Sequence, residues 1–152
     1  MCSFSMFTIP RLLESPTPVM LRQWVNMFWA GKSVGQPSSI LIALSYMYLH
    51  YASHSSRLPF FGNTVALSYA VAAILSMSIT PYTLIVLNST NAAIFKRESE
   101  VSKAEKDGRA VEERSGDESA QVLLRRWAAL NLGRVVLLLG SSVLGTWTTI
   151  NN

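Results

Sequence analysis

Three side chains that could bind a ligand or take part in chemistry lie at helical spacing along one apolar stretch near the C-terminus. Trp127, Asn131 and Arg134 are spaced i, i+4 and i+7, so on a helix they lie on one face. An arginine stays charged and presents a planar fork of donors, which suits the binding of an anion or an oxyanion. The structural alternative is that Arg134 donates to backbone carbonyls or to the asparagine.

The acidic residues of the chain do not offer Arg134 a partner within its apolar stretch. Of the nine, one is Glu14 and the other eight lie between residues 98 and 118. A guanidinium at membrane depth is costly and usually faces a protein interior or a water-filled cavity. Either Arg134 extends to the membrane interface, or its partner is not a side chain of this protein. The second reading indicates a ligand.

Further polar and aromatic residues are expected near Arg134. Thr83, Asn88 and Asn91 lie at the end of the preceding apolar stretch. Arg134 itself is about two turns into its own stretch, roughly 10 Å at 1.5 Å per residue. These groups are therefore expected at a similar depth in the membrane. Trp24 and Trp127 are expected to line an aromatic pocket at that depth. An apolar pocket with a few converging polar groups is the usual form of a small-molecule site.

Other kinds of catalytic site lack their motifs. His50 and His54 are four residues apart, but no third metal ligand accompanies them, so we interpret them as surface or interfacial histidines. Cys2 is the only cysteine, which excludes a cysteine-based metal site and an intrachain disulfide. No glycine-rich dinucleotide motif and no Ser-His-Asp set is present. We expect no metal and no organic cofactor.

Three apolar segments are long enough to cross a bilayer, at residues 34–52, 64–88 and 124–150. Each should be helical, because a segment in lipid must satisfy its own backbone. Pro81 predicts a kink in the second segment. Residues 1–13 are apolar but too short to cross, and they resemble the end of a helix whose beginning is missing. The prediction is an all-α integral membrane bundle with three full spans and a shortened N-terminal helix.

Two smaller features accompany these spans. In the third, Ser141 and Gly145 form a pair of small residues four apart, better suited to close helix packing than to chemistry. Before the first, Trp24 and Phe28 share a helical face, which suits an interfacial helix or a lid.

Composition and charge support a membrane protein with a cytoplasmic loop. Only 14% of the residues are charged, against about 25% in soluble domains. Residues 1–152 should form one membrane domain, with a charged and partly disordered or loosely helical loop at 96–121. The net charge of +4 does not indicate nucleic acid, because the charged loop is itself slightly acidic. Basic residues flank the spans mainly on the side of this loop, which orients it to the cytoplasm of an endomembrane such as the endoplasmic reticulum. These are Arg11, Arg22, Lys32, Lys96, Arg97, Arg125 and Arg126, against Arg57 on the other side.

Several stretches resemble the fungal anthrone oxygenase family of small membrane proteins. They are 23–31 (QWVNMFWAG) with Pro37 beyond it, 80–83 (TPYT) with Asn88 and Asn91 beyond it, and 127–134 (WAALNLGR). Residues 6–10 (MFTIP) resemble the end of that family's first helix. The resemblance implies a four-helix membrane bundle. It also implies oxidation of an anthrone to an anthraquinone by O2, without a cofactor, in aromatic polyketide biosynthesis.

For such a reaction, the chemistry of the candidate residues suggests their roles. Arg134 would stabilise the substrate anion, Asn131 would donate to a substrate oxygen, and Trp24 and Trp127 would stack on the rings. Thr83, Asn88 and Asn91 would line the site. The partners are then a small aromatic polyketide and the lipid bilayer, and a homo-oligomer stays open. The alternatives are a non-catalytic membrane subunit that binds a lipid headgroup or a partner's carboxylate, and a soluble helical bundle.

Overall fold

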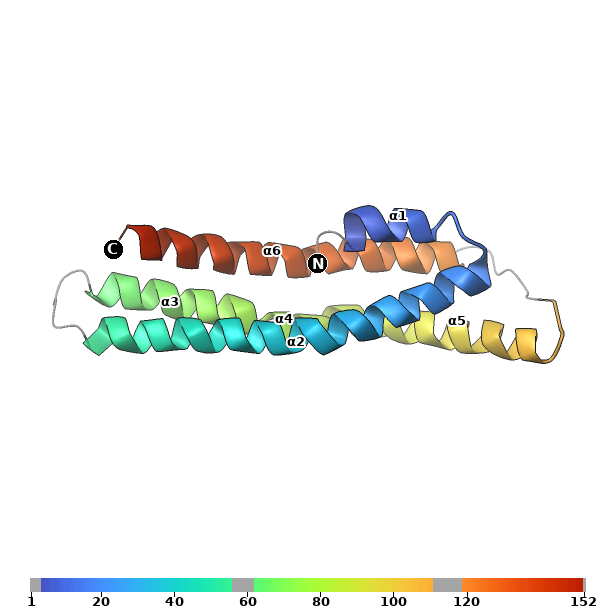
Figure 1. Cartoon of the computed structure of the whole chain (residues 1–152), viewed down its shortest axis with the longest axis horizontal. Helices are drawn as coiled ribbons and strands as arrows, with labels where there is room; N and C mark the ends of the chain where they lie inside the picture. Colours follow the sequence, from blue (N-terminus) through green and yellow to red (C-terminus); the bar gives the residue numbers. More distant parts are fainter. Residues whose placement is uncertain (1–3, 56–61, 111–118, 152) are drawn as a thin grey trace. The chain divides into compact units, whose positions relative to one another are not determined.

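The chain is all-α throughout the part that the structure describes. The computed structural model describes residues 4–55, 62–110 and 119–151, and all regular structure there is helical (Figure 1). This confirms the predicted fold class. In chain order the elements are η1 (Phe4–Thr8, a π-helix), α1 (Ile9–Leu12), α2 (Thr17–Ser55), α3 (Gly62–Met77), α4 (Ile79–Tyr82), η2 (Thr83–Leu87, a π-helix), α5 (Asn88–Lys106) and α6 (Ala120–Ile150). Arg57, the basic residue expected on the far side of the membrane, lies outside the described residues.

Two helical stretches are long and apolar enough to cross a membrane, Thr64–Lys106 and Ala120–Ile150. Only 28% and 22% of their most apolar windows are buried, so most of this apolar surface faces outward. The expected first span, 34–52, is helical within α2 but is not among the two. Its apolar character is diluted by Gln36, by serines and by tyrosines.

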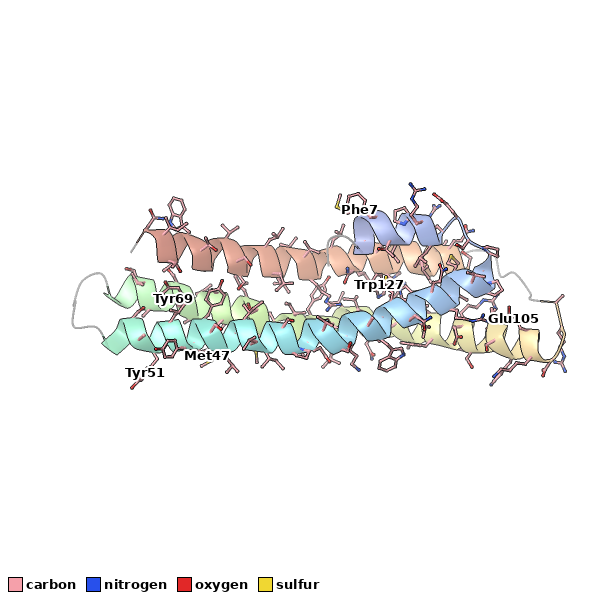
Figure 2. All side chains as sticks on the ribbon, in the orientation of Figure 1. Phe7, Met47, Tyr51, Tyr69, Glu105 and Trp127 are labelled. Atoms are coloured by element: carbon pink, nitrogen blue, oxygen red, sulfur yellow. The ribbon has the colours of Figure 1, made fainter. Side chains whose placement is uncertain are left out.

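The outward-facing side chains are apolar along much of the chain. Phe7, Met47 and Tyr51 project from the ribbon in Figure 2, and all three are largely exposed. Ile74 on α3 and Val136 on α6 are exposed as well. Large exposed apolar surface is unusual on a soluble monomer and suits a lipid or protein environment. The helices therefore have the surface of a membrane bundle.

The chain forms two compact units, each made of two separate stretches. The first unit contains residues 1–32 and 83–133, and the second contains residues 33–82 and 134–152. In the second unit, the Ser141 hydroxyl bonds to the Ser76 hydroxyl (2.7 Å) and to the Ala72 carbonyl (2.8 Å). Gly145 faces Tyr46 so closely that an added methyl group would overlap the ring. The predicted packing role of the Ser141 and Gly145 pair is confirmed.

His50 also has a structural contact in the second unit. Its Nδ1 lies 2.7 Å from the Ala66 carbonyl oxygen, which joins α2 to α3. The ring is partly buried rather than fully at the surface. The side chain of His54 lies outside the part of the chain that the structure describes.

The predicted irregularity near Pro81 is present. Proline has no N–H to donate to the carbonyl of Met77, four residues earlier. The α-helical pattern is interrupted at Ser78, between α3 and α4, and the π-helical turn η2 follows from Thr83. The break therefore lies just before the polar residues that were predicted to line a site.

The segment 96–121 is more ordered than a solvated loop. Helix α5 continues to Lys106, and Arg97 and Val101 are buried on the same helical face as Ile94. The helix ends at Lys106, and Gly108, two residues beyond, has a φ of 63°, the left-handed conformation that follows the end of many helices. The sequence-based expectation allowed a loosely helical segment but not the buried face of this helix, because charged residues hide its apolar periodicity. Residues 111–118 of the segment lie outside the described part.

Candidate aromatic binding site

The first unit contains a cluster of aromatic rings from three helices. Trp24 on α2 contacts Phe95 on α5 and Trp127 on α6, with ring centroids 5.3 Å and 5.6 Å apart. Both contacts are edge-to-face, with interplanar angles of 69° and 88°, a favourable geometry for aromatic pairs. Phe28, one turn after Trp24, stacks on it at 5.2 Å. We call these four residues with Trp29 the aromatic cluster.

The aromatic cluster extends from the core of the unit to its surface. Trp24 and Trp127 are buried, Phe28 and Phe95 are half-buried, and Trp29 is 53% exposed. Trp29 contacts both phenylalanine rings and carries the Lys32 ammonium 5.1 Å from its centroid. The cluster therefore reaches from the buried core of the unit to an exposed ring at its surface.

The two buried tryptophans differ in their hydrogen bonding. Trp127 Nε1 donates to Asn91 Oδ1 at 2.9 Å, and both side chains are buried. Trp24 Nε1 is buried and has no hydrogen-bond partner among the residues that the structure describes. The hydroxyl of Thr90, on the buried face of α5, likewise has no hydrogen-bond partner among these residues. Asn91 thus orients one indole, and the other keeps an unused donor.

Asn131 joins two distant parts of the first unit. Its side chain is 1% exposed, and its Nδ2 donates to the Ser5 hydroxyl at 2.8 Å. Ser5 belongs to η1, so this bond holds the N-terminal segment against α6. The sequence analysis missed Ser5, and the only available clue was a small polar residue within a short apolar stretch. Asn131 therefore has a packing role. Its predicted action on a substrate oxygen stays a prediction.

The structure does not bring all predicted residues into the aromatic cluster. Thr83 is half-buried at the start of η2, and Asn88 is exposed at the start of α5. One residue rotates a helix by about 100°, so Asn88 leaves the buried face that Leu87 and Asn91 share. Asn91 contacts the cluster through its hydrogen bond to Trp127.

Arg134 lies in the second unit, one residue beyond the stretch of α6 that carries Trp127 and Asn131. It is half-buried and interacts electrostatically with Tyr82 of α4. Its predicted action on a substrate anion stays a prediction.

Phe95 and Thr90 are the other members of this region that sequence reasoning missed. Phe95 directly precedes the charged run that begins at Lys96 and lies beyond the span expected at 64–88. The clue was the period of Leu87, Ile94 and Val101, which continues one apolar face into that run.

The fold and the cluster define an all-α protein with an apolar outer surface and a buried aromatic core lined by a few polar groups. A family model described as anthrone oxygenase matches residues 24–144, which include both buried tryptophans and Arg134. The chain belongs to the anthrone oxygenase family.

Curated relatives from fungi are similar over nearly the whole chain. Monooxygenase hypC of Dothistroma septosporum is 32% identical over 98% of this chain and 74% of the relative. Noranthrone monooxygenase of Aspergillus flavus is 31% identical over 95% of this chain and 64% of the relative, so the chain spans less than two thirds of that protein. Anthrone oxygenase AgnL2 of Paecilomyces divaricatus is 28% identical over 96% of this chain and 84% of the relative. No solved structure matches the chain significantly. The chain is thus a member of a family of oxidoreductases.

Proposed function

We propose that this chain oxidises an anthrone to an anthraquinone with O2, without a bound cofactor, in aromatic polyketide biosynthesis. The observation that carries the proposal is the contact of the buried Trp24 with Trp127 and Phe95, all within the region that matches the family. Aromatic side chains with a few polar groups are the usual lining of a site for a flat apolar molecule. An anthrone is such a molecule, with a carbonyl and phenolic oxygens at its edges.

The reaction balances with O2 as the only co-substrate. The anthrone loses a C10 proton and becomes a phenolate-like anion, which passes one electron to O2. The resulting radical and superoxide combine into a C10 peroxide, which is protonated. Loss of water then breaks the O–O bond and the second C10–H bond and leaves a carbonyl at C10. One oxygen atom ends in the quinone and the other in water.

The protein's tasks are to hold the tricycle, exclude bulk water and stabilise the anion. Arg134 supplies the positive charge for the anion, because a preorganised charge in an apolar site stabilises developing negative charge most effectively. It follows Trp127 and Asn131 at i+7 and i+3 on the uninterrupted helix α6. Asn131 donates to a substrate oxygen. Water or a substrate that is already ionised takes the proton, since residues 120–150 contain no acidic residue and no histidine.

The remaining candidates act on the rings and the rim of the site. Trp24 and Trp127 stack on the substrate. Asn91 positions the Trp127 indole through its hydrogen bond. Thr83 and Asn88 line the substrate site. The helices lie in an endomembrane with the charged segment at 96–121 in the cytoplasm, and the substrate partitions into that bilayer.

Oxygen uptake by membranes that contain the chain tests the proposal. Membranes with the wild-type chain and empty-vector membranes receive emodin anthrone, and the empty-vector rate corrects for autoxidation. We expect excess O2 uptake with the matching anthraquinone as product. Wild-type protein that is present in the membrane but gives no excess would contradict the proposal.

Arg134→Gln tests the assignment of the anion-stabilising charge. Its kcat/KM should fall by about a hundredfold, the usual effect of removing one donor to an oxyanion. Arg125→Gln is the matched control, because Arg125 is an exposed arginine on the same helix. Full turnover by Arg134→Gln at equal protein level would refute the role of Arg134.

A further inference from the structure

The two buried tryptophans of the aromatic cluster share an environment but not a hydrogen-bonding state. Trp127 donates its indole N–H to Asn91. Trp24 is fully buried, yet its N–H has no hydrogen-bond partner within the described residues. Trp24 is also the centre of the cluster, because its ring contacts those of Phe28, Phe95 and Trp127.

An unused donor at this position requires an explanation. Buried polar atoms in folded proteins are nearly always paired, and an unpaired one is destabilising. Packing alone does not require the nitrogen, because a wholly apolar ring of similar shape would make the same contacts. A donor that binds a ligand in a complex, and has no partner in the free protein, explains why a buried N–H is present and why it is unpaired.

We propose that Trp24 Nε1 is the hydrogen-bond donor for an oxygen atom of the flat aromatic ligand bound in this cluster. The identity of the ligand, an anthrone or anthraquinone with carbonyl and phenolic oxygens, rests on the proposed function. The donor itself follows from the structure of the first unit alone. Trp24 is then a substrate-binding residue with a polar contact, in addition to its ring surface.

The rest of the cluster fits this division of roles. Asn91 occupies the N–H of Trp127, so that ring can offer only its surface to a ligand. Phe28 and Phe95 are half-buried and meet edge-to-face at 5.1 Å, an arrangement that ring rotation can open. Thr90 adds a second buried polar atom without a partner in the described part of the chain. The unit therefore holds more hydrogen-bonding capacity than its own side chains use.

An isosteric replacement of Trp24 isolates the N–H group. The full chain in lipid nanodiscs would carry 3-benzothienylalanine at position 24, which replaces the N–H by sulfur and keeps the shape of the ring. Emodin binding and kinetics with emodin anthrone are measured, with empty nanodiscs as the blank. We expect Kd and KM to rise by about tenfold, the effect of one hydrogen bond, with kcat nearly unchanged.

Two matched controls accompany the replacement. Anthracene has the same three rings without oxygen, so both proteins should bind it equally. The same analogue at Trp147, which is 68% exposed in the second unit, should leave emodin binding unchanged. The thermal midpoint of the position-24 protein should not fall, because the replacement removes a donor that the free protein does not use.

Each result decides a separate question. Unchanged emodin affinity with the position-24 analogue would overturn the inference. A lower thermal midpoint without ligand would also overturn it, since the N–H would then be satisfied inside the free protein, for example on a ring face. Emodin binding that depends on the N–H, in a protein that consumes no O2 with an anthrone, would support the inference and contradict the proposed function.

Discussion

The hydrogen bond between Asn91 and Trp127 gives the most direct test of the first unit. The Trp127 N–H reaches the Asn91 carbonyl oxygen at 2.9 Å, and both residues are buried. Asn91→Leu keeps a branched side chain on the same helical face and removes the acceptor. The indole N–H is then left in the core without its partner, and we expect the protein to lose stability.

The size of the loss follows from the burial of both groups. An orphaned buried donor costs about 1–3 kcal/mol in soluble proteins. Hydrogen bonds between membrane helices average about 0.6 kcal/mol and reach about 1.7. We expect about 1–2 kcal/mol, because the bond lies between buried side chains but the unfolded chain in detergent has other partners. At about 2–4 °C per kcal/mol for a chain of this size, Tm should fall by about 2–8 °C.

Thermal unfolding in detergent, followed by far-ultraviolet circular dichroism, measures this loss. Asn88→Leu is the matched control, since Asn88 is an exposed asparagine on the same helix and its replacement should not lower Tm. The double variant Asn91→Leu/Trp127→Phe completes a mutant cycle, with an expected coupling of about 1 kcal/mol. Equal Tm values for the two asparagine variants, or zero coupling, would refute the reasoning.

Two further predictions concern the second unit, and both use thermal unfolding with a neighbouring residue as control. Ser141→Ala removes a buried hydroxyl with two bonds and should cost about 1–2 kcal/mol, whereas Ser142→Ala, at an exposed serine, should stay within about 0.5 kcal/mol. Equal effects would show that the buried hydroxyl contributes nothing. Gly145→Ala should destabilise the protein by about 1–3 kcal/mol relative to Gly140→Ala, because the methyl group overlaps Tyr46 at 145 but makes an ordinary contact at 140. Gly145→Ala as stable as Gly140→Ala would mean that the tyrosine ring moves aside freely.

Local features of the fold were predictable from the residues themselves. The helices, the break near Pro81 and the close packing at Ser141 and Gly145 all follow from composition or from spacing along a single helix. The length of α5 was not predictable in this way, because the charged residues after Lys96 conceal the buried face to which Arg97 and Val101 belong.

The sequence by itself determined the all-α class, the apolar surface of the helices and the shared face of Trp127, Asn131 and Arg134 on α6. Those properties depend on the order of residues within one helix, where backbone geometry sets the direction of every side chain. Only the tertiary structure decided which faces meet. It joined Asn131 to Ser5, placed Phe95 against Trp24 and paired Asn91 with Trp127. It left the Trp24 N–H without a hydrogen-bond partner among the described residues. Such pairings join segments far apart in the chain, and they depend on how whole helices pack against one another.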